Sequence, residues 1–281
     1  MPTSTAQRAE DLITAKIRRD QADPAFRRAV HAEHAQWGRV TAQRIPELAD
    51  LAPYNKARGV NEDSLPHLDE ICAFFTDAGV PPTLEVWAGD ASERLGAALA
   101  RRGLFAGAVS ATLHLDLDGQ PHNQSQGQAQ GQGQGQGTVT VEELAPSAED
   151  TDYFDTLVGG YEIAEENPTY LAMLRAEQGP ASVRRYLARV DGRPAAAASL
   201  YATPDGAMLS GAATLPGFRR QGCQSALILR RLADAAAVTD LAIVTVAFGS
   251  ASHANLERVG FRQTHTRTAW SRLDLAPGAA H

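Results

Sequence analysis

The residues with the most specific chemistry in this chain lie in segment 214–226, TLPGFRRQGCQSA. A Pro-Gly turn is followed by two arginines, by Gly222 and by apolar residues at helical spacing. This pattern predicts a strand end, a basic loop and the start of a helix. Backbone N–H groups at a helix N-terminus attract anions, so the segment is suited to binding a phosphate or pyrophosphate. Gly222 permits a close backbone approach that a side chain would hinder.

The loop sequence Arg-Arg-Gln-Gly-Cys-Gln at 219–224 resembles the acyl-CoA loop of the GCN5-related N-acetyltransferases (GNAT), whose pattern is Arg/Gln-x-x-Gly-x-Gly/Ala. Thr214 upstream and Gly260-Phe261 downstream also fit this family, and the resemblance covers residues 138–273. It implies a GNAT fold and an N-acyltransferase that takes acetyl-CoA as its acyl donor. One position departs from the pattern, because Gln224 stands where the family most often has Gly or Ala.

The resemblance also assigns roles around this loop. Backbone groups of Ala213 and Thr214 would pair with the amides of pantetheine and supply an N–H to the thioester oxygen. Plain pairing within a sheet is the alternative for both. Asn255 would touch the cofactor arm, whereas Cys223 is expected to pack at the helix start. The cofactor-binding residues expected in this way are Ala213, Thr214, Arg219, Arg220, Gln221, Gly222, Cys223, Gln224 and Asn255.

The general acid is missing from its usual position. Many family members have a tyrosine four residues before the Gly-Phe pair, which protonates the departing thiolate, and this chain has Leu256 there. Either another group such as Tyr161, Tyr170 or His253 donates the proton, or water does, or the thiolate leaves unprotonated, which a thiol pKa of ~8.5 allows. A site that has lost catalysis is the remaining alternative.

The general base is expected in segment 160–170, GYEIAEENPTY, because the resemblance implies that this segment overhangs the acceptor. Glu162 and Glu165 are the candidate catalytic residues, because a carboxylate near an apolar wall can take a proton through water. A solvated acidic loop is the structural alternative, and His253 and His265 are further candidates. No cluster of His, Cys or Asp has the spacing of metal ligands, so no metal is expected.

Composition limits the partners. The chain has 281 residues and a net charge of −7, so we expect no nucleic-acid partner. Its two cysteines, Cys72 and Cys223, lie far apart, which favours a reducing cytoplasm over a disulfide scaffold. No apolar run approaches the ~20 residues that cross a membrane, so no membrane partner is expected. The expected acceptor is a small-molecule or peptide amine. The resemblance is also compatible with a homodimer.

A Gly/Gln-rich segment at 119–137 divides the chain almost in half and predicts a flexible linker. It separates a first domain, residues 1–118, from an acyl-CoA-binding catalytic domain, residues 138–275. Apolar periodicity and turn residues in the second domain predict the order β-α-α-β-β-β-α-β-α-β, with a hairpin turn at Asp191-Gly192. The predicted fold class is α/β, with tandem GNAT-like domains that each have a mixed, mostly antiparallel sheet flanked by helices.

The first half carries weaker signals. Residues 24–45 have a long helical pattern, and a strand at 83–89, a helix at 92–102 and a strand at 108–117 follow. Strand, helix, glycine and strand occur in the same order in the second half, so we interpret the first half as a degenerate GNAT-like copy. An unrelated α/β domain is the alternative. The first half has no Arg-x-x-Gly-x-Gly, so it is expected to serve as a scaffold or as a wall of the acceptor pocket.

Overall fold

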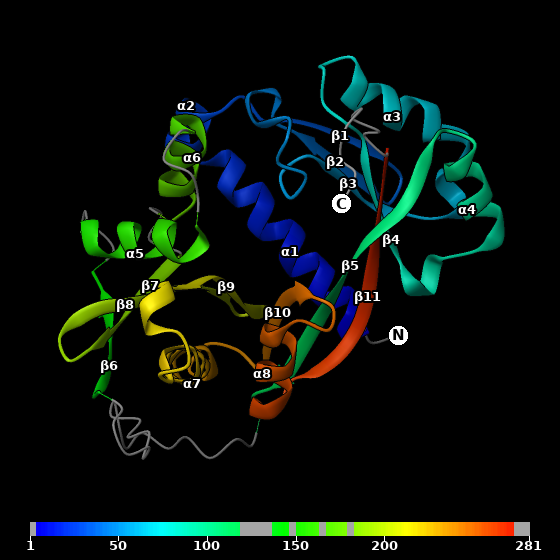
Figure 1. Ribbon diagram of the computed structural model, residues 1–281. Helices are drawn as coiled ribbons and strands as arrows, with labels where there is room; N and C mark the ends of the chain where they lie inside the picture. The colour runs from blue at the N-terminus through cyan, green and yellow to red at the C-terminus, as the bar shows by residue number, and fades with distance from the viewer. Residues whose placement is uncertain (1–3, 119–136, 146–149, 163–166, 179–182, 273–281) are drawn as a thin grey trace, which may run out of the picture. The chain divides into compact units, whose positions relative to one another are not determined.

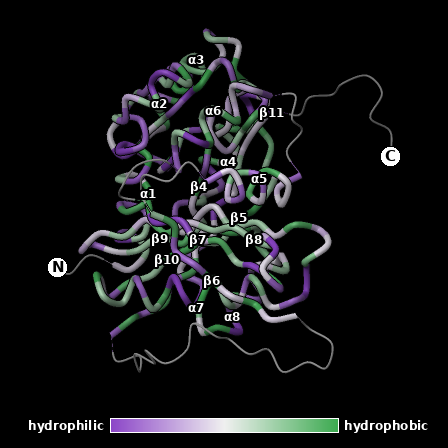
Figure 2. Tube along the Cα trace, turned by 90° about the vertical axis from the view of Figure 1, so that its left-hand side faces the viewer, coloured by the Kyte–Doolittle hydropathy of each residue, from purple (hydrophilic) through white to green (hydrophobic). Residues whose placement is uncertain are grey.

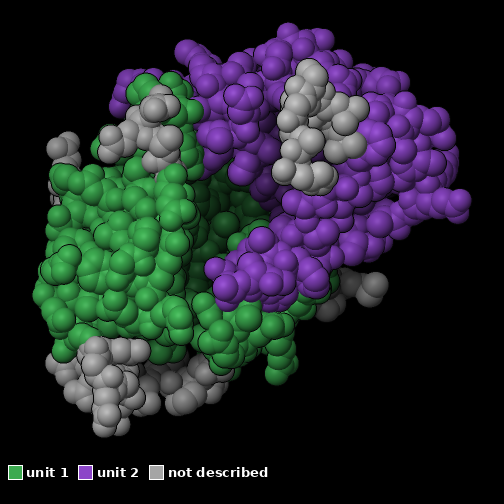
Figure 3. All heavy atoms as spheres, in the orientation of Figure 1, with its two compact units in different colours: residues 1–26, 112–245, 254–264 green, residues 27–111, 246–253, 265–281 purple. Residues whose placement is uncertain are grey.

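The structure, a computed structural model, describes residues 4–118, 137–145, 150–162, 167–178 and 183–272 (Figure 1). The chain forms two compact units, coloured separately in Figure 3. Unit 1 comprises residues 1–26, 112–245 and 254–264, and unit 2 comprises residues 27–111, 246–253 and 265–281. Except for Gly137, the predicted linker 119–137 lies outside the described residues.

Unit 1 is built on a sheet whose strands come mainly from the second half of the chain and carry both hydrophobic and hydrophilic residues (Figure 2). Four successive strands pair antiparallel, and the next strand pairs in parallel with the fourth. Asp191 and Gly192 have φ values of 49° and 78°, as a tight hairpin turn requires, which confirms that prediction. The strands are β6 (Val139–Leu144), β7 (Val183–Val190), β8 (Arg193–Thr203), β9 (Gly206–Thr214) and β10 (Leu241–Ala247).

The helices of unit 1 bury apolar side chains against this sheet. On α5, Tyr153 and Leu157 pack against Leu187 and Ala213. The N-terminal helix, which the sequence analysis did not predict, packs Leu12 and its neighbours against strands β8 and β10. The helices are α1 (Thr5–Ala22), α5 (Thr151–Tyr161), α6 (Pro168–Gln178), α7 (Cys223–Ala236) and α8 (Ala251–Val259), the last divided between the units. From β6 onward, the predicted order of elements is confirmed.

The helix predicted at 24–45, most of which lies in unit 2, is wrong over most of its length. Only α2 (Pro24–Ala29) is helical there, and the rest forms a hairpin in which Trp37 pairs with Val40 across Gly38, whose φ is 55°. A glycine with positive φ suits a two-residue turn, and Val40 and Ala42 alternate into the core as strand residues do. The remaining elements are β1 (Glu33–Trp37), β2 (Val40–Arg44), β3 (Lys56–Val60), α3 (Leu68–Thr76), β4 (Thr83–Trp87) and α4 (Glu93–Ala100), with 3₁₀ turns at Pro46–Leu48, Glu62–His67 and Ala88–Asp90.

Each unit takes a strand from the other half of the chain. In unit 2, β11 (Arg262–Arg272) pairs antiparallel with β4, so that Arg267 lies opposite Trp87. In unit 1, the end of β5 (Leu104–Asp116) lies beside β10, and Leu117 N donates to Asp240 O over 2.7 Å. Each of these exchanged strands follows a left-handed glycine, as the predicted repeat of strand, helix, glycine and strand requires.

The compact units and the predicted domains are different divisions of the chain. Helix α1 belongs to unit 1, and most of β11 belongs to unit 2, because long strands pass from one unit to the other. The domain bounds 1–118 and 138–275 therefore stay a prediction.

The close approach of α5 to β9 gives a first stability prediction. A Cβ on Gly160 would lie 2.7 Å from Ala213 Cβ and 2.9 Å from Thr214 N. Gly160→Ala is therefore expected to destabilise the protein by about 1–3 kcal/mol, although alanine favours helices. The matched helical glycine is Gly96 in α4, where a Cβ would make ordinary contact with Trp270 at 3.6 Å. Gly96→Ala should leave the melting temperature unchanged or raise it, and equal losses in both variants would contradict the packing argument.

Candidate functional site

The basic loop turns sharply just before α7. It follows β9 and a 3₁₀ turn at Pro216–Phe218, and both Arg220 (φ 67°) and Gly222 (φ 86°) have left-handed backbones. A Cβ placed on Gly222 would have no heavy atom within 4 Å, so the space in front of the loop is open. The loop therefore presents its main chain to solvent at the helix start.

The N-terminus of α7 has no side-chain cap. Gly222 is its N-cap residue, and the first helical hydrogen bond runs from Ala226 N to Gly222 O. The N–H groups that precede Ala226 thus have no acceptor within the helix, which is the arrangement that binds phosphate. Cys223 is buried, and burial raises the pKa of its thiol, so a thiolate is disfavoured at this position.

Two side-chain contacts tie the loop to its surroundings. Gln224 Nε2 donates to Thr214 Oγ1 over 2.8 Å, so the unusual glutamine bridges α7 to the end of β9. Arg219 Nη2 lies 3.0 Å from Glu162 Oε1, and the two side chains are 50% and 63% exposed. An exposed pair of this kind contributes little to stability, so Arg219 can exchange Glu162 for a phosphate at small cost. The structure places the candidate base Glu162 beside the loop, and Glu165 lies outside the described residues.

The sheet opens beside this loop. The parallel pairing of β9 with β10 ends at Met208 opposite Ile243, whereas β9 continues to Thr214. On the other edge, Leu215 N donates to Ala195 O. Backbone groups alternate between edges along a strand, so the N–H of Thr214 points away from β8 and towards the open edge. Thr214 thus has the orientation that pantetheine pairing needs, while Ala213 is paired with Ala197.

A bulge in β9, which was not predicted from the sequence, lies at the same opening. Ser210 pairs with Ser199 and Ala213 with Ala197, so Gly211 and the residue after it stand opposite a single residue of β8. Gly211 has a φ of 53°, and a Cβ on it would lie 2.7 Å from Ser199 Oγ. The only sequence signal is a glycine inside a strand pattern.

Several solved structures have a fold similar to that of this chain. A functionally unknown conserved protein from Staphylococcus epidermidis superposes with a TM-score of 0.59 at 11% identity, over 86% of this chain and 94% of that one. A GCN5-related N-acetyltransferase from Kribbella flavida gives 0.57 at 18% identity, over 92% and 97%. A tandem GNAT protein from the clavulanic acid biosynthesis pathway gives 0.57 at 15%, over 89% and 84%. No family model and no curated protein matches the sequence.

This chain has the GNAT fold. The tandem neighbour covers both halves, so the first half is a GNAT-like copy as well. In each half two parallel strands are joined by a 3₁₀ turn and a helix: β3 with β4, and β9 with β10. The copy in the first half therefore has a counterpart of the acyl-CoA loop where β3 leads towards α3.

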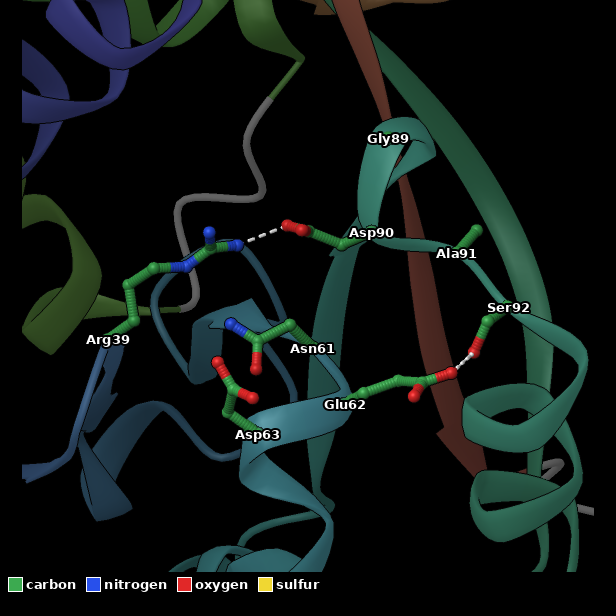
Figure 4. Close-up of a pocket in the computed structure, with 8 residues that line it drawn as sticks. All are labelled: Arg39, Asn61, Glu62, Asp63, Gly89, Asp90, Ala91 and Ser92. Carbon is green, nitrogen blue, oxygen red and sulfur yellow. Dashed lines mark hydrogen bonds and ion pairs between the residues drawn. The ribbon is translucent and has the colours of Figure 1, made fainter.

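That counterpart is acidic. A pocket of about 310 Å³ in unit 2 is lined by residues that follow β3 and β4, with Arg39 at one side. Figure 4 shows Arg39 paired with Asp90, and Glu62 accepting a hydrogen bond from Ser92. The N–H groups at this turn are partly satisfied by a capping box of Asn61 and Ser64. Carboxylates and a capped turn disfavour a pyrophosphate at this place.

The helix before the last strand of the GNAT fold also departs from the pattern. Leu256 is buried, so the usual tyrosine position faces the interior. Asn255 Oδ1 accepts from Arg258 Nη2 over 2.6 Å, and its contact with a cofactor stays a prediction. Ser250 Oγ accepts from His253 N, so Ser250 caps the start of this helix.

The remaining acid and base candidates divide between the units. His253 and His265 belong to unit 2, and Tyr161 and Tyr170 to unit 1. Desolvation raises the pKa of Tyr161 to about 12, although 42% of the residue is exposed. Tyr161 is therefore protonated at neutral pH and able to donate a proton. Among the described residues, no three His, Cys, Asp or Glu side chains group as metal ligands, and no helix is long and apolar enough to cross a membrane.

Proposed function

We propose that this chain is an acyl-CoA-dependent N-acyltransferase that moves an acetyl group from acetyl-CoA to an amine by direct attack. The uncapped N-terminus of α7 carries the proposal, because it lies directly after the open end of β9 in a GNAT fold. A pyrophosphate on the N–H groups from Gly222 onward would let pantetheine run along the open edge at Thr214.

The chemistry then needs few side chains. The neutral amine nitrogen attacks the thioester carbon, the carbonyl oxygen gains charge, and the C–S bond breaks to release the coenzyme A thiolate. The amine loses one proton to water or a base, and the thiolate gains one from an acid or from water, which leaves an amide and a free thiol. Backbone N–H groups at the opening in β9 are the candidate donors to the charged oxygen.

A non-catalytic acyl-CoA-binding regulatory protein is the alternative function. It is favoured by one observation, the burial of a leucine at the position of the usual acid. The test incubates the full chain with acetyl-CoA and a panel of small amines and peptide N-termini, and follows release of the thiol. Transfer above the background of each amine alone supports the enzyme. Tight acetyl-CoA binding by calorimetry without transfer to any amine supports the regulatory protein.

The pH profile tests the missing acid. With saturating acetyl-CoA, turnover should climb as the acceptor amine loses its proton and then reach a plateau, because no protein acid limits the thiolate's departure. Circular dichroism at each pH serves as the folding control. A descending limb while the protein is folded would show that a protein group donates the proton. A descending limb that Tyr161→Phe removes would identify the donor as Tyr161.

A further inference from the structure

Arg231 is a buried guanidinium without a carboxylate partner in the part of the chain that the structure describes. It lies on α7, is 2% exposed, and takes part in no ion pair. Burial lowers its pKa to about 10, and nearby tyrosine hydroxyls offset this in part, so the side chain is charged at neutral pH. A buried unpaired charge is costly, so this position calls for a physical explanation.

The hydrogen bonds of Arg231 lead to the bulge in β9. Its Nη1 donates to Ser199 O over 3.1 Å and to Ser210 O over 3.3 Å, and its Nε donates to Leu227 O in its own helix. Ser199 and Ser210 are the last residues that pair in register before Gly211. One rigid, forked side chain therefore holds both strands at the point where the bulge begins.

This contact also orients the next peptide group. The peptide between Ser210 and Gly211 is planar and trans, so its C=O and N–H point in opposite directions. Since the Ser210 carbonyl points to Arg231, the Gly211 N–H points away from it. Gly211 lies three residues before Thr214, about 10 Å along the strand at ~3.3 Å per residue. A pantetheine arm that runs from the phosphate loop past Thr214 would therefore bring its thioester close to Gly211.

We infer that Arg231 is a positioning residue for acyl transfer: it fixes the β9 bulge and adds buried positive charge behind the peptide that faces the thioester. The inference rests on the proposed function. The charge would stabilise the oxyanion and the departing thiolate, which matters more in a site whose usual acid position is a buried leucine. Arg231 acts through the backbone carbonyls of Ser199 and Ser210, which accept its hydrogen bonds.

The experiment compares Arg231→Met and Arg231→Lys with the control Arg230→Met. Arg230 is the neighbouring residue on the same helix, and its guanidinium pairs with Asp234 and Glu143 instead. In Arg231→Met, kcat should fall about 100-fold, the size of losing one oxyanion donor, while the acetyl-CoA Kd stays within about twofold. Arg231→Lys retains the charge without the fork and should recover part of kcat. Arg230→Met should match the unaltered protein in both quantities.

The outcomes separate the inference from the function it rests on. If the unaltered protein transfers acetyl groups and Arg231→Met is folded with kcat within about threefold, the inference is wrong and the function stands. A lower melting temperature with unchanged kcat, or failure of Met, Lys and Gln variants to fold, would make Arg231 purely structural and overturn it. Absence of transfer by the unaltered protein rejects the function and the inference with it.

Discussion

Gly222→Glu is expected to abolish acetyl-CoA binding, with a Kd at least about 100-fold weaker by calorimetry. The side chain would enter the open space before the α7 N-terminus and bring a negative charge to the N–H groups proposed to hold the pyrophosphate. A non-glycine residue at a φ of 86° costs about 1–2 kcal/mol, so the protein should remain folded at room temperature.

Gly192→Glu is the matched control for this substitution. Gly192 has a φ of 78° and lies in the turn between β7 and β8, where a Cβ would have no heavy atom within 4 Å. Gly192→Glu places a side chain at a similar positive φ and adds the same negative charge as Gly222→Glu. Unchanged affinity in Gly222→Glu, or an equal loss in Gly192→Glu, would contradict the assignment of the loop.

Gly211→Ala is expected to cost about 3 kcal/mol or more of unfolding free energy and most of the turnover. Its Cβ would lie 2.7 Å from Ser199 Oγ, and a φ of 53° adds the strain of a left-handed backbone. Relief requires Ser199 Oγ to leave its hydrogen bond with Ser210 Oγ or the bulge to move, and the N–H groups proposed to face the thioester would move with the bulge. Thermal unfolding and kcat at saturating acetyl-CoA measure the two effects.

Gly192→Ala is again the matched control, because it introduces backbone strain without a close packing contact. Gly192→Ala has the same unfavourable sign of φ without a close neighbour, so it should lose only about 1–2 kcal/mol and keep its turnover. If Gly211→Ala is no less stable and no less active than Gly192→Ala, then the bulge adapts freely, and its geometry is not important for the reaction.

Local patterns predicted most of unit 1. Asp191-Gly192 specified a hairpin turn, and the Gly222 loop was placed before the correct helix, because turn conformation and helix amphipathicity are encoded by nearby residues. The same logic failed at 24–45. A helical spacing of apolar residues there also fits a strand on which Val40 and Ala42 alternate, and only pairing across Gly38 decides between them.

The sequence alone determined the GNAT-like order of elements, the basic loop and the absence of a tyrosine at Leu256. The tertiary structure decided that β11 pairs with β4, that Arg219 meets Glu162, and that Arg231 reaches the bulge at Gly211. These contacts join residues far apart in the chain, and their formation depends on which strands and helices pack together. A periodic pattern specifies a local conformation, whereas the partners of a buried charge are specified by the whole packed core.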